Sequence, residues 1–186
     1  MPFDHFGVIA PIFSRVGYSS LETLLKQADL PTPGRVLDAG GGTGRVANAI
    51  REHAGEVVIA DPSLGMLREA DRTQLRLACS NSEALPFPND SFERIIMVDA
   101  LHHVIHQGET AREMYRVLKP GGRIVIEEPD IRTFGVKLIA VAEKVLLMRS
   151  HFLTPQNIVN LFSFDSAKTN IQAMEGNAWV VIEKPE

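Results

Sequence analysis

Residues 35–49 read RVLDAGGGTGRVANA, and this stretch decides the fold. Val36 and Leu37 are typical of a buried strand, and four glycines then crowd the five positions from 40 to 44. Apolar residues return at helical spacing after Gly44. A strand, a tight glycine turn and a helix form the opening unit of a doubly wound α/β domain. Because glycine has no Cβ, the turn also leaves room for a ligand next to the backbone.

The spacing of the glycines excludes two common phosphate-binding loops. A dinucleotide fingerprint, G-x-G-x-x-G, that started at Gly40 would need its third glycine where Arg45 stands. The loop G-x-x-x-x-G-K-[ST] fails at the same position, and no lysine follows it. The feature that remains is an acid, Asp38, at the strand end ahead of the glycines.

The composition is that of one compact domain. The chain has 186 residues, of which 45% are hydrophobic and 23% charged. Its net charge is −4 and it has no basic run, so a nucleic acid is not an expected partner. The single Cys79 and an N-terminus without a signal-peptide pattern favour the cytoplasm. The longest apolar stretch, 136–148, contains three charges, so no stable membrane insertion is expected.

Three phrases of the sequence resemble class I S-adenosylmethionine-dependent methyltransferases of the small-molecule type. The first is DAGGGTG at 38–44, which corresponds to motif I of that family. The second is NSEALPFPNDSFE at 81–93, and the third is YRVLKPGGRIVIEEP at 115–129. The phrases follow one another in the family's order. The chain is most similar to the ubiquinone/menaquinone-biosynthesis type of these enzymes.

The resemblance implies a Rossmann-like, doubly wound α/β fold: a seven-stranded, mostly parallel sheet with an antiparallel C-terminal hairpin and helices on both faces. One domain is expected over 1–186, with 1–30 as an N-terminal helical cap or flap and 131–165 as a helical region on the acceptor side. Hydrophobic patterns predict the further strands and the helices. The strands are expected at 56–60, 75–79, 94–99, 123–127, 166–174 and 178–184, and helices at 20–30, 64–70, 109–118, 134–148 and from 154 onward.

The resemblance also implies S-adenosylmethionine as the cofactor, with S-adenosylhomocysteine as the product. This ligand has no phosphates, and its ammonium and sulfonium suit the carboxylate of Asp38. Asp61, at the end of the second strand, suits the two ribose hydroxyls. Asn81 stands where the family has an acid for the adenine amino group, and its carbonyl accepts the same hydrogen bond. The candidate cofactor residues are Asp38, Gly40, Gly41, Gly42, Gly44, Asp61, Pro62, Met66, Asn81, Ser82, Asp99 and Tyr18.

Several of these residues have a structural alternative. Asp61 could instead cap the next helix, although Ser63 is the better cap. Met66 resembles the family residue that packs on the adenine, but it also fits as a core methionine. Tyr18 either contacts the sulfonium through a cation–π interaction or belongs to an N-terminal helix that closes one edge of the core.

Methyl transfer from a sulfonium depends mainly on alignment, so the chemistry does not require one particular catalytic residue. A hydroxyl or carbon acid must still lose a proton. The candidates for this step are Asp99, at the end of the fourth strand, Glu127 and Glu128, at the end of the fifth, and the histidines His103 and His151. An architectural role is the alternative for His103, and an exposed loop position is the alternative for His151. No metal site is predicted, because His102 and His106 share a helical face without a matching cysteine or acid.

The predicted function is methyl transfer from S-adenosylmethionine to a small, largely apolar acceptor. Two alternatives remain open. One is a regulatory protein that binds the same cofactor without catalysis. The other is an enzyme of the same fold that uses NAD or another nucleotide, which the failed dinucleotide fingerprint disfavours. The oligomeric state has no signature in the sequence.

Overall fold

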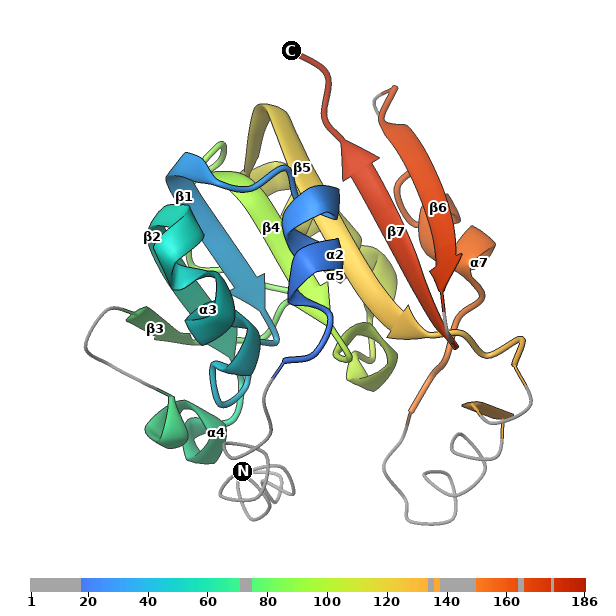
Figure 1. The fold of residues 1–186 in the computed structure, drawn as a ribbon, viewed down its shortest axis with the longest axis horizontal. Helices are drawn as coiled ribbons and strands as arrows, with labels where there is room; N and C mark the ends of the chain where they lie inside the picture. Colours follow the sequence, from blue (N-terminus) through green and yellow to red (C-terminus); the bar gives the residue numbers. More distant parts are fainter. Residues whose placement is uncertain (1–17, 71–74, 134–135, 138–149, 164–165, 175) are drawn as a thin grey trace.

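The computed structural model shows a seven-stranded sheet with helices on both faces (Figure 1). It describes residues 18–70, 75–133, 136–137, 150–163, 166–174 and 176–186. The strands are β1 (Thr32–Ala39), β2 (Ala54–Asp61), β3 (Leu75–Cys79), β4 (Phe92–Val98), β5 (Leu118–Pro129), β6 (Lys168–Met174) and β7 (Asn177–Glu183). The helices are α2 (Leu21–Gln27), α3 (Arg45–Ile50), α4 (Leu64–Glu69), α5 (Gln107–Val117) and α7 (Pro155–Asn160), with 3-10 turns η1 (Arg51–His53) and η2 (Leu101–His103).

The strand order is β3-β2-β1-β4-β5-β7-β6. The pairs among β1 to β5 are parallel, whereas β7 runs antiparallel to both β5 and β6. The chain moves outward from β1 to β3 and then returns to the other side of β1 with β4. Such a reversal separates the connections that leave the carboxyl ends of β1 and β4, and ligands of open α/β sheets bind in the crevice formed there. The expected fold class is confirmed.

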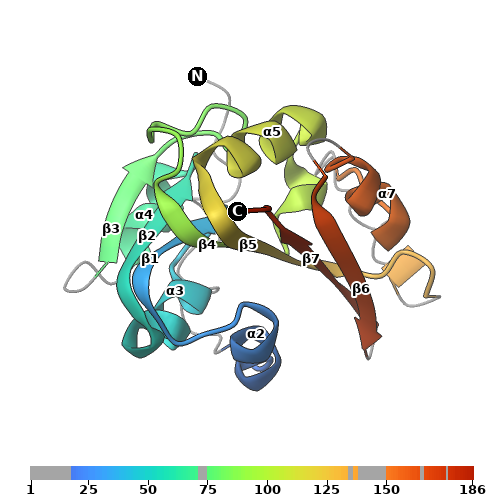
Figure 2. The ribbon, with the colours of Figure 1, turned by 90° about the horizontal axis from the view of Figure 1, so that it is seen from above.

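Apolar side chains fill both faces of the sheet because strands buried on two sides carry them at consecutive positions. On one face, which α5 and α7 cover in Figure 2, Leu37 packs in a cluster with Met114 and Phe162. On the other face, which α2 and α3 cover, Val36 packs in a cluster with Leu24. Neighbouring residues of β1 thus belong to two different cores.

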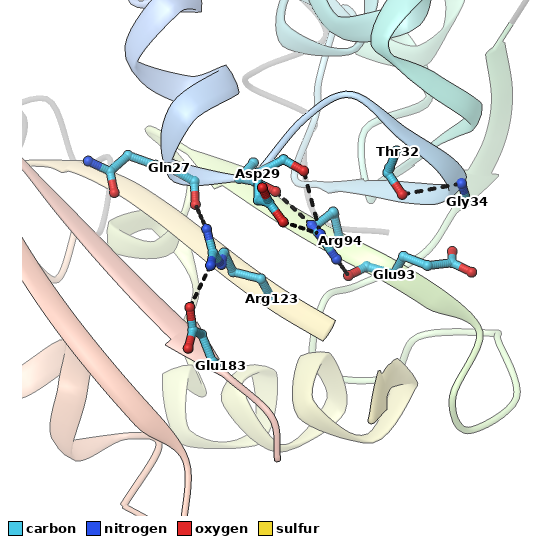
Figure 3. Close-up of polar contacts among 9 residues, drawn as sticks. Gln27, Asp29, Thr32, Gly34, Glu93, Arg94, Arg123 and Glu183 are labelled. Atoms are coloured by element: carbon cyan, nitrogen blue, oxygen red, sulfur yellow. Dashed lines mark hydrogen bonds and ion pairs between the residues drawn. The ribbon is translucent and has the colours of Figure 1, made fainter. Parts of the chain in front are cut away.

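Polar contacts fasten α2 to the amino-terminal edge of the sheet (Figure 3). Arg94 of β4 donates from Nε to the carbonyl of Ala28 at 2.7 Å. Arg123 of β5 donates to the carbonyl of Gln27 at 3.0 Å and to the Glu183 carboxylate of β7 at 2.6 Å. The end of α2 is therefore held at the edge opposite the crevice, and its beginning lies toward the crevice.

Most predicted elements are confirmed to within a few residues, and the difference after α5 has a clear cause. The helix expected at 109–118 ends at Val117, and β5, expected at 123–127, already begins at Leu118. Leu118 already pairs with Phe92 of β4, and a register shift follows in the ladder. Within the described ranges no helix combines the length and apolar character that crossing a bilayer requires.

Parts of two expected regions fall outside the described residues. Residues 1–17 of the N-terminal cap and most of the helix expected at 134–148 belong to this group. Of the acceptor-side region 131–165, the described part includes α7, whose first turn is capped because Thr154 Oγ1 accepts a hydrogen bond from Asn157 N at 3.2 Å.

Candidate active site

The glycine turn between β1 and α3 lies at the crevice and has the backbone that only glycine adopts readily. Gly40, Gly42 and Gly44 have φ angles of 72°, 55° and 78°. A Cβ on Gly40 would lie 2.7 Å from Cβ of Ala100, so the turn approaches the end of β4 closely. Among the described residues, the nearest atoms to a Cβ on Gly42 would be Met66 Sδ at 3.8 Å and Asp61 Oδ2 at 4.0 Å, which is ordinary van der Waals contact. Unlike Gly40, Gly42 is therefore not closely packed by the described residues.

Asp61 lies at the end of β2, beside the turn. One carboxylate oxygen accepts a hydrogen bond from Gly42 N at 2.9 Å, and the other accepts one from Ser63 N at 2.8 Å. These two bonds orient the carboxylate beside the turn. That Asp61 accepts from two adjacent ribose hydroxyls stays a prediction.

Asp38 lies beneath the turn. The residue is 1% exposed, and its carboxylate accepts a hydrogen bond from Ala47 N of α3 at 3.1 Å. Gly41 packs directly over it, since a Cβ there would lie 2.6 Å from Oδ2 of Asp38. Burial raises the pKa of Asp38 to about 7, and the nearby Asp61 adds to this effect. Asp38 therefore holds the turn and α3 together, and its predicted contact with the cofactor stays a prediction.

The residues expected near the adenine follow the ends of β2 and β3. Met66 is buried, and its Sδ would lie 3.8 Å from a Cβ on Gly42. Its helix α4 begins with a cap, because Ser63 Oγ accepts a hydrogen bond from Met66 N at 3.1 Å. Pro62 and Asn81 are exposed, whereas Ser82 is buried. Ser63 is thus the N-cap of α4, as the sequence favoured, and the Asp61 carboxylate accepts from the N–H of that cap residue.

The remaining candidates gather at the ends of β4 and β5. Asp99 has a φ of 51°, and its N–H donates to the carbonyl of Glu127 at 3.0 Å. Its carboxylate is 44% exposed and pairs with Nη2 of Arg45 at 3.2 Å. The guanidinium of Arg45 lies 5.5 Å from the ring centroid of Tyr18. The ring that was expected to face the sulfonium thus faces another cation of the site.

Glu127, in β5, is 2% exposed. Tyr18 donates to one of its oxygens at 2.6 Å, and Asn177 of β7 donates to the other at 2.8 Å. Burial raises the pKa of the Glu127 carboxyl above its usual range, and burial and the bond to Glu127 raise the pKa of Tyr18. The contact connects the segment ahead of α2 to the end of β5.

The two candidate histidines differ in their surroundings. His103, in η2, has Nδ1 at 3.3 Å from Ser150 Oγ, and burial and the neighbouring His102 lower its pKa to about 4. His103 is therefore neutral at physiological pH. The side chain of His151 is exposed. Its backbone N–H donates a hydrogen bond to the carbonyl of His102 at 2.6 Å.

Sequence reasoning missed two residues of this group. Arg45 entered only as the residue that breaks the dinucleotide fingerprint, although a cation directly after a ligand-binding turn was a usable signal. Asn177 had no local signal, because its contact with Glu127 depends on the antiparallel pairing of β7 with β5, in which Asn177 lies opposite Pro129.

Comparison with known proteins agrees with this geometry. A family model described as a methyltransferase domain matches residues 37–126. A ubiquinone/menaquinone biosynthesis C-methyltransferase of Coxiella burnetii is 39% identical over 115 residues, which cover 56% of this chain and 46% of that protein. A demethylmenaquinone methyltransferase of Corynebacterium urealyticum is 33% identical over 125 residues, 67% of this chain and 54% of that protein. The chain spans about half the length of these curated relatives.

A solved structure gives the same picture for the fold. A SAM-dependent methyltransferase from Thermotoga maritima superimposes with a TM-score of 0.79 at 20% identity, covering 96% of this chain and 98% of that one. The sequence match lies over the turn, β2, β4 and β5, and the structural match extends over nearly the whole chain. Residues 37–126 therefore match a methyltransferase domain in sequence, and the fold is similar to that of a SAM-dependent methyltransferase of known structure.

Proposed function

We propose that this chain is an enzyme that transfers a methyl group from S-adenosylmethionine to a small, largely apolar molecule. The observation that carries the proposal is the glycine turn at the carboxyl end of β1, with the carboxylate of Asp61 oriented beside it by the N–H groups of Gly42 and Ser63. A nucleoside without phosphates fits a glycine turn that is flanked by carboxylates.

In this proposal one set of residues binds the ribose of the nucleoside and another set binds its adenine. Asp61 accepts hydrogen bonds from the ribose hydroxyls. Met66, Pro62, Asn81 and Ser82 form the adenine side. The glycine turn provides the backbone surface between these residues and the end of β4.

When bound, the cofactor would supply an activated methyl group on its sulfonium. The acceptor would attack the methyl carbon in line with the carbon–sulfur bond, and S-adenosylhomocysteine would leave as the neutral thioether. The protein aligns the acceptor and keeps water out of the crevice. Asp99 and His103 follow the carboxyl end of β4 and are the proposed residues for removing a proton from the acceptor. His103 is unprotonated at neutral pH because its pKa is lowered to about 4. His151 contributes through its backbone contacts.

The acceptor class is inferred from chemistry and from the relatives. The aromatic ring of Phe152 stacks on the ring of His102 in η2, with centroids 4.5 Å apart. The named relatives act in ubiquinone and menaquinone biosynthesis. A reduced quinone is therefore the acceptor to test first. We propose a small molecule as the partner, in preference to a nucleic acid, because the net charge is −4.

Two measurements test the function. In isothermal titration, S-adenosylhomocysteine should bind at least about tenfold more tightly than NAD or ATP, a difference of about 1.4 kcal/mol. Incubation with methyl-labelled S-adenosylmethionine and a short-chain reduced quinone should move label into the organic phase. If NAD or ATP binds and S-adenosylhomocysteine does not, the proposal fails. If S-adenosylhomocysteine binds and no small apolar acceptor takes up label, the regulatory alternative holds instead.

A further inference from the structure

The strand β6 forms one outer edge of the sheet, and along this edge it has no partner strand among the described residues (Figure 2). On its inner side it pairs with β7 at every position from Lys168 to Met174, without a register shift. The outer side therefore presents an uninterrupted row of backbone N–H and carbonyl groups along a strand of seven residues. A strand of another chain completes such a row by forming hydrogen bonds with it.

The strand β6 lacks the features by which natural edge strands avoid this pairing. Those features are a short strand, a bulge, a proline or a charge within the strand. The ladder with β7 has no bulge, residues 168–174 contain no proline, and their one charged residue, Lys168, stands at the end. The opposite edge strand, β3, is shorter, with five residues, and it contains Arg76, which pairs with Glu56 of β2. The sheet thus protects one edge and leaves the other open.

The surface around β6 has the composition of a protein interface. All seven side chains of the strand are exposed, and Ile171 and Met174 are two of the four large apolar residues that are exposed in the described part of the chain. Helix α7 contacts β6 and adds the exposed amides of Asn157 and Asn160. Lys168 is the one charged residue in α7 and β6, in a chain that is 23% charged. Depletion of charge around exposed apolar side chains is typical of the centre of an interface.

We propose that β6 pairs antiparallel with β6 of a second copy of this chain, so that two seven-stranded sheets join into one. A two-fold axis at Ile171 relates the two strands, and each copy contributes the same residues to the contact. The proposal does not depend on the function proposed above, because β5 and β7 separate β6 from β4 and from the crevice.

The sequence of β6 is complementary to itself about this axis, which favours a second copy over an unrelated partner. Ile171 lies opposite Ile171 of the second copy, so two exposed apolar side chains cover each other. Lys168 lies opposite Met174 of the second copy, so the two lysines do not face each other. The remaining opposed residues are uncharged. With the axis at Ile171 the whole strand is paired, whereas any other position of the axis leaves part of it unpaired.

The test places opposite charges at the axis. Sedimentation velocity at about 1 to 100 μM protein measures the oligomeric state of the wild type, of Ile171→Lys and Ile171→Glu alone, and of an equimolar mixture of the two variants. Ile105→Lys is the matched control, because Ile105 is also exposed and lies between η2 and α5. Circular dichroism and urea denaturation show that each variant is folded.

We expect the wild type and Ile105→Lys to form dimers. In each Ile171 variant alone, the dimer dissociation constant should rise by at least about tenfold, because like charges face each other across the axis. The mixture should form dimers again, since the introduced lysine of one copy then faces the introduced glutamate of the other.

A wild type that stays monomeric at the highest concentration would overturn the proposal, and this measurement does not depend on the variants. Dimers that persist in both Ile171 variants would place the interface elsewhere on the chain and would also overturn it. Folded monomeric variants whose mixture remains monomeric would show that β6 does not pair with itself at Ile171, with the same consequence.

Discussion

Oε2 of Glu128 lies 2.5 Å from Nδ1 of His102, and both side chains are 5% exposed. The other carboxylate oxygen accepts hydrogen bonds from the N–H groups of Ala100 and Leu101, at 2.9 and 2.7 Å. One buried carboxylate at the end of β5 therefore holds three consecutive residues after β4. These residues lead directly into the segment that carries His103.

Glu128→Ala should lower the free energy of unfolding by about 2–5 kcal/mol, because it leaves two backbone N–H groups and His102 without their buried acceptor. Glu128→Gln should cost less, since its carbonyl oxygen still accepts from both N–H groups. Urea denaturation measures all three proteins. The exposed Glu109 provides the control, and Glu109→Ala should stay within about 0.5 kcal/mol of the wild type. A loss in Glu128→Ala no larger than in the control would contradict this role.

Gly42→Ala should weaken binding of S-adenosylhomocysteine by at least about tenfold, or 1.4 kcal/mol, because its methyl group enters the space proposed for the ligand. The backbone also has a φ of 55°, so the fold should lose about 1–2 kcal/mol. Gly121→Ala is the matched control. Gly121 has a φ of 69° and lies at the opposite edge of the sheet, and among the described residues a Cβ there would have Glu186 alone within 4 Å.

Both variants should therefore show a similar loss in urea denaturation, and only Gly42→Ala should lose affinity in calorimetry. If Gly121→Ala lost affinity to the same degree, reduced stability rather than occupied space would explain the result.

Asp61→Ala should weaken binding of S-adenosylhomocysteine by about 1–3 kcal/mol, through the loss of charge-assisted hydrogen bonds to the ribose. The Asp61→Ala variant also loses the hydrogen bond from Gly42 N, so its free energy of unfolding is measured alongside its affinity. Ser63→Ala offers a comparison, because it removes the cap of α4 next to Asp61 and leaves the carboxylate in place. That change should cost about 0.5–2 kcal/mol of stability with affinity preserved. Unchanged affinity in Asp61→Ala would remove Asp61 from the site.

The buried carboxyl of Asp38 should make stability depend on pH. Its pKa is about 7 in the folded chain and about 3.9 when unfolded, so between these values the folded state binds the additional proton. Stability from this group is present below about pH 4 and is lost as the pH rises to about 7.

The free energy of unfolding of the wild type should therefore fall by about 2–4 kcal/mol relative to Asp38→Asn between pH 4 and 8. Asparagine does not titrate, and its carbonyl oxygen accepts the same bond from Ala47 N. Denaturation series at several pH values give both curves. Parallel curves would show that Asp38 titrates in its ordinary range.

The fold was predictable because its determinants are local. The turn at Gly40–Gly44, the caps Ser63 and Thr154, and the alternation of apolar strands and helices each act within a few residues. The extension of β5 back to Leu118 was not predictable in this way, since it depends on pairing with Phe92 across the sheet.

The candidate site was predictable only in part. Asp61 and Asp99 follow strands and could be placed at the crevice from the chain order alone. The burial of Asp38, the contact between Tyr18 and Glu127, and the pairing of Arg45 with Asp99 depend on how side chains from distant segments orient. Spacing along the chain contains no information on these orientations.

The left-handed backbone at Asp99 has a consequence for engineering this chain. Glycine would adopt a φ of 51° there more easily and would keep the N–H that donates to Glu127. A selection for thermal stability alone would therefore tend to replace Asp99 by glycine and discard its carboxylate at the crevice. Libraries intended to stabilise the protein should hold position 99 fixed, so that robustness is not gained at the expense of turnover.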